Sequence, residues 1–91
     1  MKKNDVINVL TSLRNVEEEN VFDYNDIVNY FGDDLFKKFI DCKFKYKDSL
    51  IFINDLYNNC IIVIDDRQMC TSDYAINRVY FDVLSDGWKF L

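Results

Sequence analysis

The sequence contains no histidine and no proline, and its only glycines are Gly32 and Gly87. The lack of histidine removes the commonest general base and the usual nitrogen ligand of zinc. Two isolated glycines cannot form a glycine-rich phosphate loop. The sequence has three cysteines, Cys42, Cys60 and Cys70, and no two of them have the Cys-x-x-Cys spacing of a metal knuckle. An odd number of unpaired cysteines is typical of proteins of the reduced cytosol. We therefore expect a cytoplasmic protein that is not an enzyme and holds no cofactor or metal.

Length and composition fit one domain spanning residues 1–91. Of these residues 49% are hydrophobic and 16% are aromatic, which suits a packed core and excludes disorder. No apolar run approaches the roughly 18 residues of a membrane span. The 16 acidic and 11 basic residues give a formal charge of -5. This charge disfavours non-specific attraction to nucleic acid and favours a partner with a basic surface.

Two short apolar runs at 50–53 and 60–64 flank a polar, turn-prone segment, a pattern that predicts an antiparallel β-hairpin. If Ile53 faces Cys60, one face carries Ile51, Ile53, Cys60, Ile62 and Ile64, and the other carries Leu50, Phe52, Ile61 and Val63. Both faces are then apolar. Such a hairpin has to be covered on both sides, by helices of its own chain or by a partner, which includes a second copy in a homodimer.

The residues before this hairpin have helical periodicity. Apolar residues at 6–13 predict a first helix over 4–13, followed by a polar loop at 15–20. Asp23 can cap a second helix over 24–31, which Gly32 ends. Asp33 can cap a third helix, whose apolar stripe runs from Leu35 to Phe44. The predicted fold is therefore α+β, with three N-terminal helices packed on an antiparallel hairpin.

The last segment fits two structures. Apolar residues between Ala75 and Leu84 match one helical face, with Thr71 or Ser72 as cap, whereas 79–83 also alternate as a strand does. A turn at 85–87 before Trp88 would then form a second hairpin, giving a four-stranded antiparallel meander. Helix is favoured over 73–84 because more positions fit it, and the strand alternative stays open.

Helix, short extended piece, helix, glycine turn, helix and hairpin is the order of elements in a winged helix-turn-helix domain. The chain resembles that family from about residue 4 to 66. The resemblance implies DNA binding, with the third helix in the major groove and Lys37, Lys38, Lys45 and Lys47 on phosphates. Asp33 and Asp34 at the start of that helix count against this alternative, because they would face phosphates.

Charge is strongly segregated along the chain. Residues 15–36 contain no basic residue, and then five lysines crowd into 37–47. Helix dipoles alone would explain the aspartates at helix starts, but not three consecutive glutamates in a loop. We expect the acidic residues to dock on the basic surface of a partner protein, as small acidic DNA mimics do. In type the chain resembles phage or mobile-element inhibitors, including anti-CRISPR proteins. The predicted contact residues are Glu17, Glu18, Glu19, Asp23, Asp26, Asp33 and Asp34.

Overall fold

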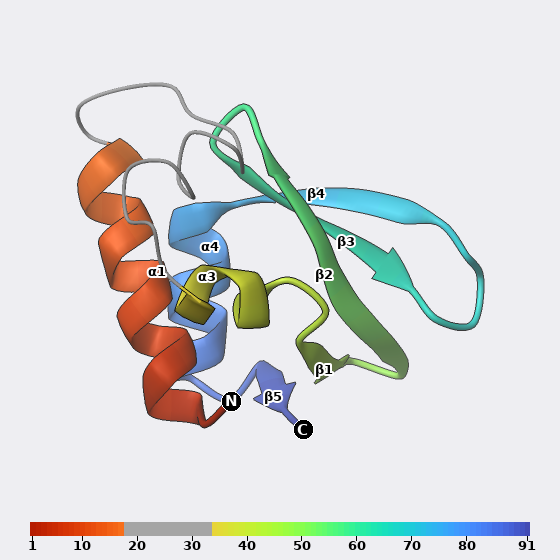
Figure 1. Ribbon diagram of the computed structural model, residues 1–91. Coiled ribbons are helices and arrows are strands. Elements are labelled where there is room, and N and C mark those ends of the chain that lie inside the picture. The colour runs from red at the N-terminus through yellow and green to blue at the C-terminus, as the bar shows by residue number, and fades with distance from the viewer. Residues whose placement is uncertain (18–33) are drawn as a thin grey trace.

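The computed structural model describes residues 1–17 and 34–91 (Figure 1). These residues form α1 (Lys3–Glu17), α3 (Asp34–Phe39), β1 (Lys43–Tyr46), β2 (Ser49–Tyr57), β3 (Cys60–Asp65), β4 (Thr71–Ala75), α4 (Ile76–Leu84) and β5 (Trp88–Phe90). The strands form one antiparallel sheet in the order β4-β3-β2-β1-β5. The predicted α+β class is confirmed. Three N-terminal helices on a hairpin are not confirmed, because α1 is the only long N-terminal helix described and the helix expected at 24–31 lies outside the described residues.

Helix α1 buries one face because its apolar residues recur at helical spacing. Val6, Val9, Leu10 and Leu13 have no exposed surface. The helix extends beyond the predicted end to Glu17, so the expectation of a loop was wrong for residues 15–17. Nothing there stops a helix, since asparagine and glutamate continue one at small cost and no glycine or proline intervenes.

The predicted third helix was too long. Helix α3 ends at Phe39, and Phe44, expected on its stripe, lies in β1. The chain turns at Asp41, whose φ is 74° and whose backbone N–H donates to the Ile53 carbonyl at 2.7 Å. From Lys43 onward exposed and buried residues alternate, which is the period of a strand and not of a helix. Phe39 and Phe44, which were expected on one helical stripe, therefore lie in two different elements.

The predicted hairpin is confirmed in β2 and β3, but its register was wrong. Tyr57 lies opposite Cys60, where Ile53 was expected. The connection is the two-residue turn Asn58–Asn59, with φ of 51° and 62°. Two successive left-handed residues are what a type I′ turn requires, and asparagine adopts them at little cost. Residues 54–57, treated as loop in the sequence-based register, extend β2 instead.

The register decides which side chains of the hairpin enter the core. Ile51, Ile53 and Leu56 of β2 are buried together with Ile61 and Val63 of β3. The expected grouping set Ile61 and Val63 on the opposite face and was therefore wrong. An irregularity in the pairing just after Ile53 shifts the alternation, so that Leu56 also points inward.

The strand alternative for residues 79–83 was wrong, because these residues lie in α4 (Ile76–Leu84) and the strand that follows pairs with β1 and not with them. Strand β4 includes Thr71 and Ser72, which were expected to cap a helix, and α4 starts at Ile76 without a side-chain cap. The favoured helix is confirmed over Ile76–Leu84. Trp88 then opens β5, which pairs with β1.

The sheet curls around the core. Strands β4 and β5 lie at opposite edges, yet the rings of Tyr74 on β4 and Trp88 on β5 meet edge-on at 5.3 Å between centroids. Tyr46 of β1 contacts both rings, at 5.9 Å and 5.5 Å. The face that carries these rings is therefore concave. Helices α1 and α4 lie side by side against the sheet (Figure 1), and their buried residues join the same core.

We predict that Phe44→Ala lowers the free energy of unfolding by about 3–5 kcal/mol, because Phe44 is fully buried and packs on Trp88 and Phe90. Denaturant unfolding measures the change. The matched control is Phe81→Ala on α4, whose side chain is 56% exposed and which should cost about 1 kcal/mol or less. Equal losses in the two variants would contradict the assigned core.

Candidate functional site

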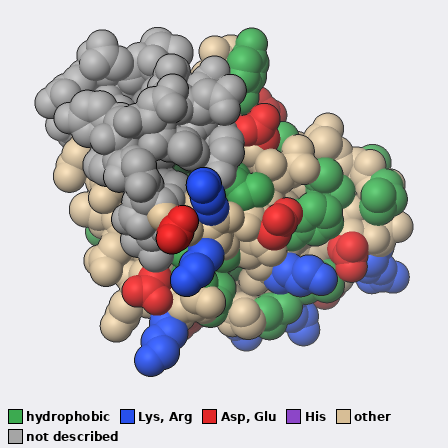
Figure 2. Space-filling view, viewed as in Figure 1, with side chains coloured by type: hydrophobic (Ala, Val, Ile, Leu, Met, Phe, Trp, Pro, Cys, Tyr) green, Lys and Arg blue, Asp and Glu red, His purple; other side chains and the backbone are tan. Residues whose placement is uncertain are grey.

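The sheet face opposite the helices carries an apolar stripe. Because side chains alternate along a strand, Leu50 and Phe52 of β2 and Ile62 and Ile64 of β3 point away from the buried face. All four are half-buried, and Phe52 pairs directly with Ile64. Figure 2 shows hydrophobic side chains at the surface over these strands, beside charged ones. We call this surface the open face.

Lysines flank the stripe on the β1 side. Lys43 pairs with Phe52, and Lys45 pairs with Leu50 on one side and with Lys89 of β5 on the other. All three lysines are exposed. Like charges directly opposite on neighbouring strands destabilise a sheet, so the pairing of Lys45 with Lys89 is not explained by stability.

A shallow hollow at this flank concentrates the positive charge. It is lined by Lys45, Lys47 and Lys89 with Asp48 and Gly87. Lys47 reaches the hollow because it occupies the turn after β1 with a φ of 55°. The hollow can attract a carboxylate or phosphate group.

Aspartates lie at three places around the stripe. Asp73 of β4 and Asp55 of β2 both lie opposite Ile62, one on each side of it. Asp66 follows β3, and its backbone N–H donates to the Leu50 carbonyl at 2.8 Å. The lysines thus gather on the β1 side of the stripe, whereas Asp73 lies on its β4 side and Asp55 and Asp66 lie towards its two ends.

Two carboxylates elsewhere are held in the charged form. Hydrogen bonds from Ser49 and from the backbone N–H groups of Arg67 and Gln68 lower the pKa of Asp65. The Lys3 ammonium, 2.6 Å from the carboxylate, lowers the pKa of Asp86. A carboxylate of lowered pKa is poorly suited to act as a general acid near neutral pH.

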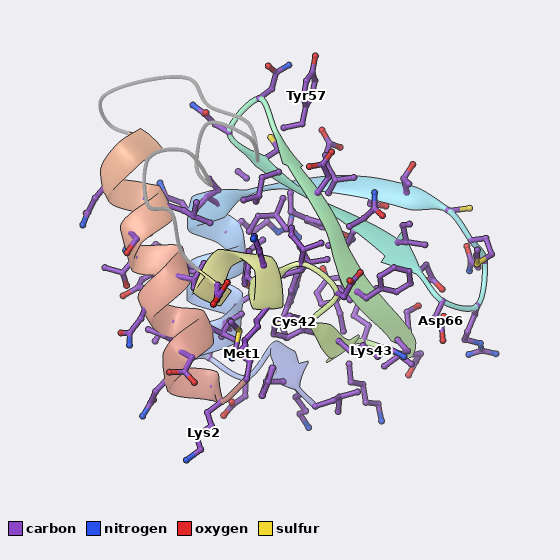
Figure 3. The ribbon with its side chains drawn as sticks, viewed as in Figure 1. Met1, Lys2, Cys42, Lys43, Tyr57 and Asp66 are labelled. Atoms are coloured by element: carbon purple, nitrogen blue, oxygen red, sulfur yellow. The ribbon has the colours of Figure 1, made fainter. Side chains whose placement is uncertain are left out.

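A second hollow surrounds Cys42 near the chain ends (Figure 3) and is lined by Met1, Lys38, Asp41, Cys42, Lys43, Phe90 and Leu91. The Cys42 thiol donates to the Lys38 carbonyl at 3.1 Å, and its sulfur lies 3.4 Å from that of Met1. Burial raises the pKa of this thiol, against an opposing effect of the amino terminus. The thiol therefore stays protonated at neutral pH, which suits a buried packing group and not a nucleophile.

Most of the predicted acidic set lies outside the described residues: Glu18, Glu19, Asp23, Asp26 and Asp33. Glu17 is the last residue of α1, and Asp34 is the exposed first residue of α3. Of the acidic set, Asp34 alone has a described side chain.

The lysines of the DNA-binding alternative fall on a helix, a strand and a turn. Lys37 and Lys38 are exposed on α3, whereas Lys45 lies on β1 and Lys47 in the turn after it. A single helix does not present all four. Sequence reasoning missed Lys89, which the fold brings beside Lys45 from 44 residues away in the chain. In the sequence, Lys89 stands between the apolar residues Trp88 and Phe90, and this alternation indicates that Lys89 faces outward.

Within the described ranges 1–17 and 34–91, no group of three or more histidine, cysteine or acidic side chains is arranged to hold a metal ion. No helix in this part of the chain is long and apolar enough to cross a membrane. No family model, curated protein or solved structure matches this chain.

We predict that Lys89→Glu raises the free energy of unfolding by about 0.2–1 kcal/mol, because it replaces a like-charge cross-strand pair with an opposite-charge pair. The gain should shrink at high salt and disappear in the double variant Lys45→Glu/Lys89→Glu. Urea unfolding at low and high salt measures both effects. Lys37→Glu on α3 is the control and should give no gain. A gain of equal size in the double variant would contradict the pairing.

Proposed function

We propose that this protein acts without catalysis, by docking on the basic surface of another protein that handles nucleic acid. It would then be a small acidic inhibitor of the kind that phages and mobile elements encode, working in the cytoplasm. The predicted contact surface is the acidic stretch from Glu17 to Asp34.

The distribution of charge carries this proposal. Residues 18–33 contain five acidic residues and no basic one, and in the rest of the chain acidic and basic residues are equal in number. The net charge of -5 is therefore a property of one short stretch and not of the whole surface. The electrostatics of helix ends does not explain such a concentration of acidic residues, because a helix dipole stabilises only the carboxylates in the first turn of a helix.

A basic groove that normally holds nucleic acid is a suitable partner for this stretch. Such a groove is lined by lysine and arginine spaced to meet phosphates, and carboxylates at similar spacing can replace them. Charge complementarity would speed the encounter and make binding sensitive to salt.

The winged-helix alternative, DNA binding through Lys37, Lys38, Lys45 and Lys47, has one observation in its favour. Lys45, Lys47 and Lys89 line one hollow, and the Lys45–Lys89 pair would be relieved by a phosphate. Against it, Asp48 lines the same hollow, and the chain as a whole is acidic.

We predict that tagged protein captures a bacterial protein that survives nuclease treatment and is displaced by added duplex DNA. Capture should fall strongly in the triple variant Glu17→Gln/Glu18→Gln/Glu19→Gln, because three of the proposed contacts lose their charge. The measurement is a pull-down from lysate split into nuclease-treated and untreated halves, with protein and nucleic acid both quantified.

The matched control removes three negative charges elsewhere, as Asp41→Asn/Asp48→Asn/Asp66→Asn, at exposed positions whose backbone conformation asparagine tolerates. This control should capture as the natural sequence does. Nucleic acid in the captured fraction, with its proteins lost on nuclease treatment, would instead favour the lysine alternative. Equal capture by the two triple variants would rule out the acidic stretch as the contact.

A further inference from the structure

We propose that the hollow between β1 and β5 binds a small phosphate dianion, either the free ion or the phosphate group of a small monoester. We call it the lysine hollow, defined by Lys45, Lys47 and Lys89 with Asp48 and Gly87. It shares no residue with the acidic stretch of the proposed function, so either proposal can fail without the other.

The lining of the lysine hollow suits a charged ligand. Four of its five lining residues are charged, and the fifth, Gly87, has no side chain. Its volume is about 300 Å³, which lies at the lower end of the range of small-molecule sites. One phosphate group with a short organic substituent fits such a volume, and an apolar ligand would find no apolar side chain to contact.

The positive charge of the hollow is not neutralised within the described part of the chain. None of the three lysines forms an ion pair with another described residue, although Asp48 lines the same hollow. Asp86, next to Gly87, is held by the Lys3 ammonium at 2.6 Å. Three ammonium groups against one carboxylate leave two positive charges, which matches the charge of about −1.5 to −2 on a phosphate monoester at neutral pH.

Two features of the lysine hollow reduce the stability of the fold. Lys45 and Lys89 lie directly opposite each other, and like charges so placed destabilise a sheet. Lys47 has a φ of 55°, a left-handed conformation that glycine and asparagine adopt more readily than lysine does. Its ammonium lies 5.2 Å from the centroid of the Tyr46 ring, and this contact offsets part of the cost. Departures from the rules of local stability that meet at one place are typical of a binding site.

The number of ammonium groups favours a phosphate dianion over other anions. Lys45 on β1, Lys89 on β5 and Lys47 in the turn after β1 reach the hollow from three parts of the fold. A phosphate monoester offers three terminal oxygens, one for each ammonium, whereas a carboxylate offers two oxygens and a single charge. A nucleic acid backbone matches less well, because each of its phosphodiesters carries one charge.

The test follows the backbone amide signals of the full chain by nuclear magnetic resonance during titration with phosphoserine, at constant ionic strength and slightly alkaline pH. We expect saturable shifts centred on residues 45–48 and 87–89, and no such shifts with serine or acetate. Inorganic phosphate should shift the same signals, because it is also a dianion under these conditions. Comparing the two saturation curves distinguishes the free ion from a monoester as the preferred ligand.

Lys47→Asn and Lys89→Gln separate binding from stability. Each removes one ammonium from the hollow and should weaken phosphoserine binding about tenfold. Each should also make the unliganded fold slightly more stable in urea unfolding, because a strained turn residue or a like-charge pair is relieved. A merely structural role would not raise stability and lower affinity together. Lys37→Gln removes an exposed ammonium from α3 and should change neither quantity.

Three outcomes would overturn the proposal. Equal shifts with acetate at the same ionic strength would show general screening of charge. Unchanged binding in Lys47→Asn and Lys89→Gln, or an equal loss in Lys37→Gln, would remove the hollow as the site. Tighter binding of duplex DNA that lacks terminal phosphates would assign these lysines to a phosphodiester backbone instead.

Discussion

The contact between the two edges of the sheet determines the shape of this molecule. Tyr74 on β4 meets Trp88 on β5, and Tyr46 on β1 contacts both, so a sheet of five strands closes over a single aromatic cluster. That closure makes the inner face concave and gives α1 and α4 a hollow to fill. It also makes the opposite face convex, with β2 and β3 along its crest. The open face is the opposite face of the same strands, and strand alternation decides which side chains point to it.

The elements that the sequence predicts well are those decided by local chemistry. Helix α1 has four apolar residues at helical spacing, and the hairpin has two β-branched runs with asparagines between them, so both were found. The register was missed because either pair of residues, 54–55 or 58–59, can make a turn. Only the pairing of β2 with its neighbours on both sides selects Asn58–Asn59. Phe44 was misassigned for a similar reason, since its position four residues after Ile40 fits a helix while the alternation with Lys43 and Lys45 fits a strand.

The open face could not be predicted from local patterns, because its members come together through strand pairing. Lys45 and Lys89 are opposite each other only because β5 returns beside β1 after α4. Asp73 lies beside Ile62 only because residues 71–75 form β4 and not the start of a helix. The composition predicts a cover on both sides of the hairpin, and for the open face this stays a prediction. With the correct register, the residues of that face are Phe52 and Ile64 with Leu50 and Ile62.

Two kinds of electrostatic pattern act at different ranges in this chain. On the open face the strands of Lys45 and Asp73 lie three strand spacings apart, roughly 14 Å. Their fields largely cancel beyond a Debye length of about 8 Å at physiological salt, so they orient a partner only at contact. The five acidic residues of 18–33 have no basic residue among them. They can attract a basic partner before any contact forms, with a strong dependence on salt.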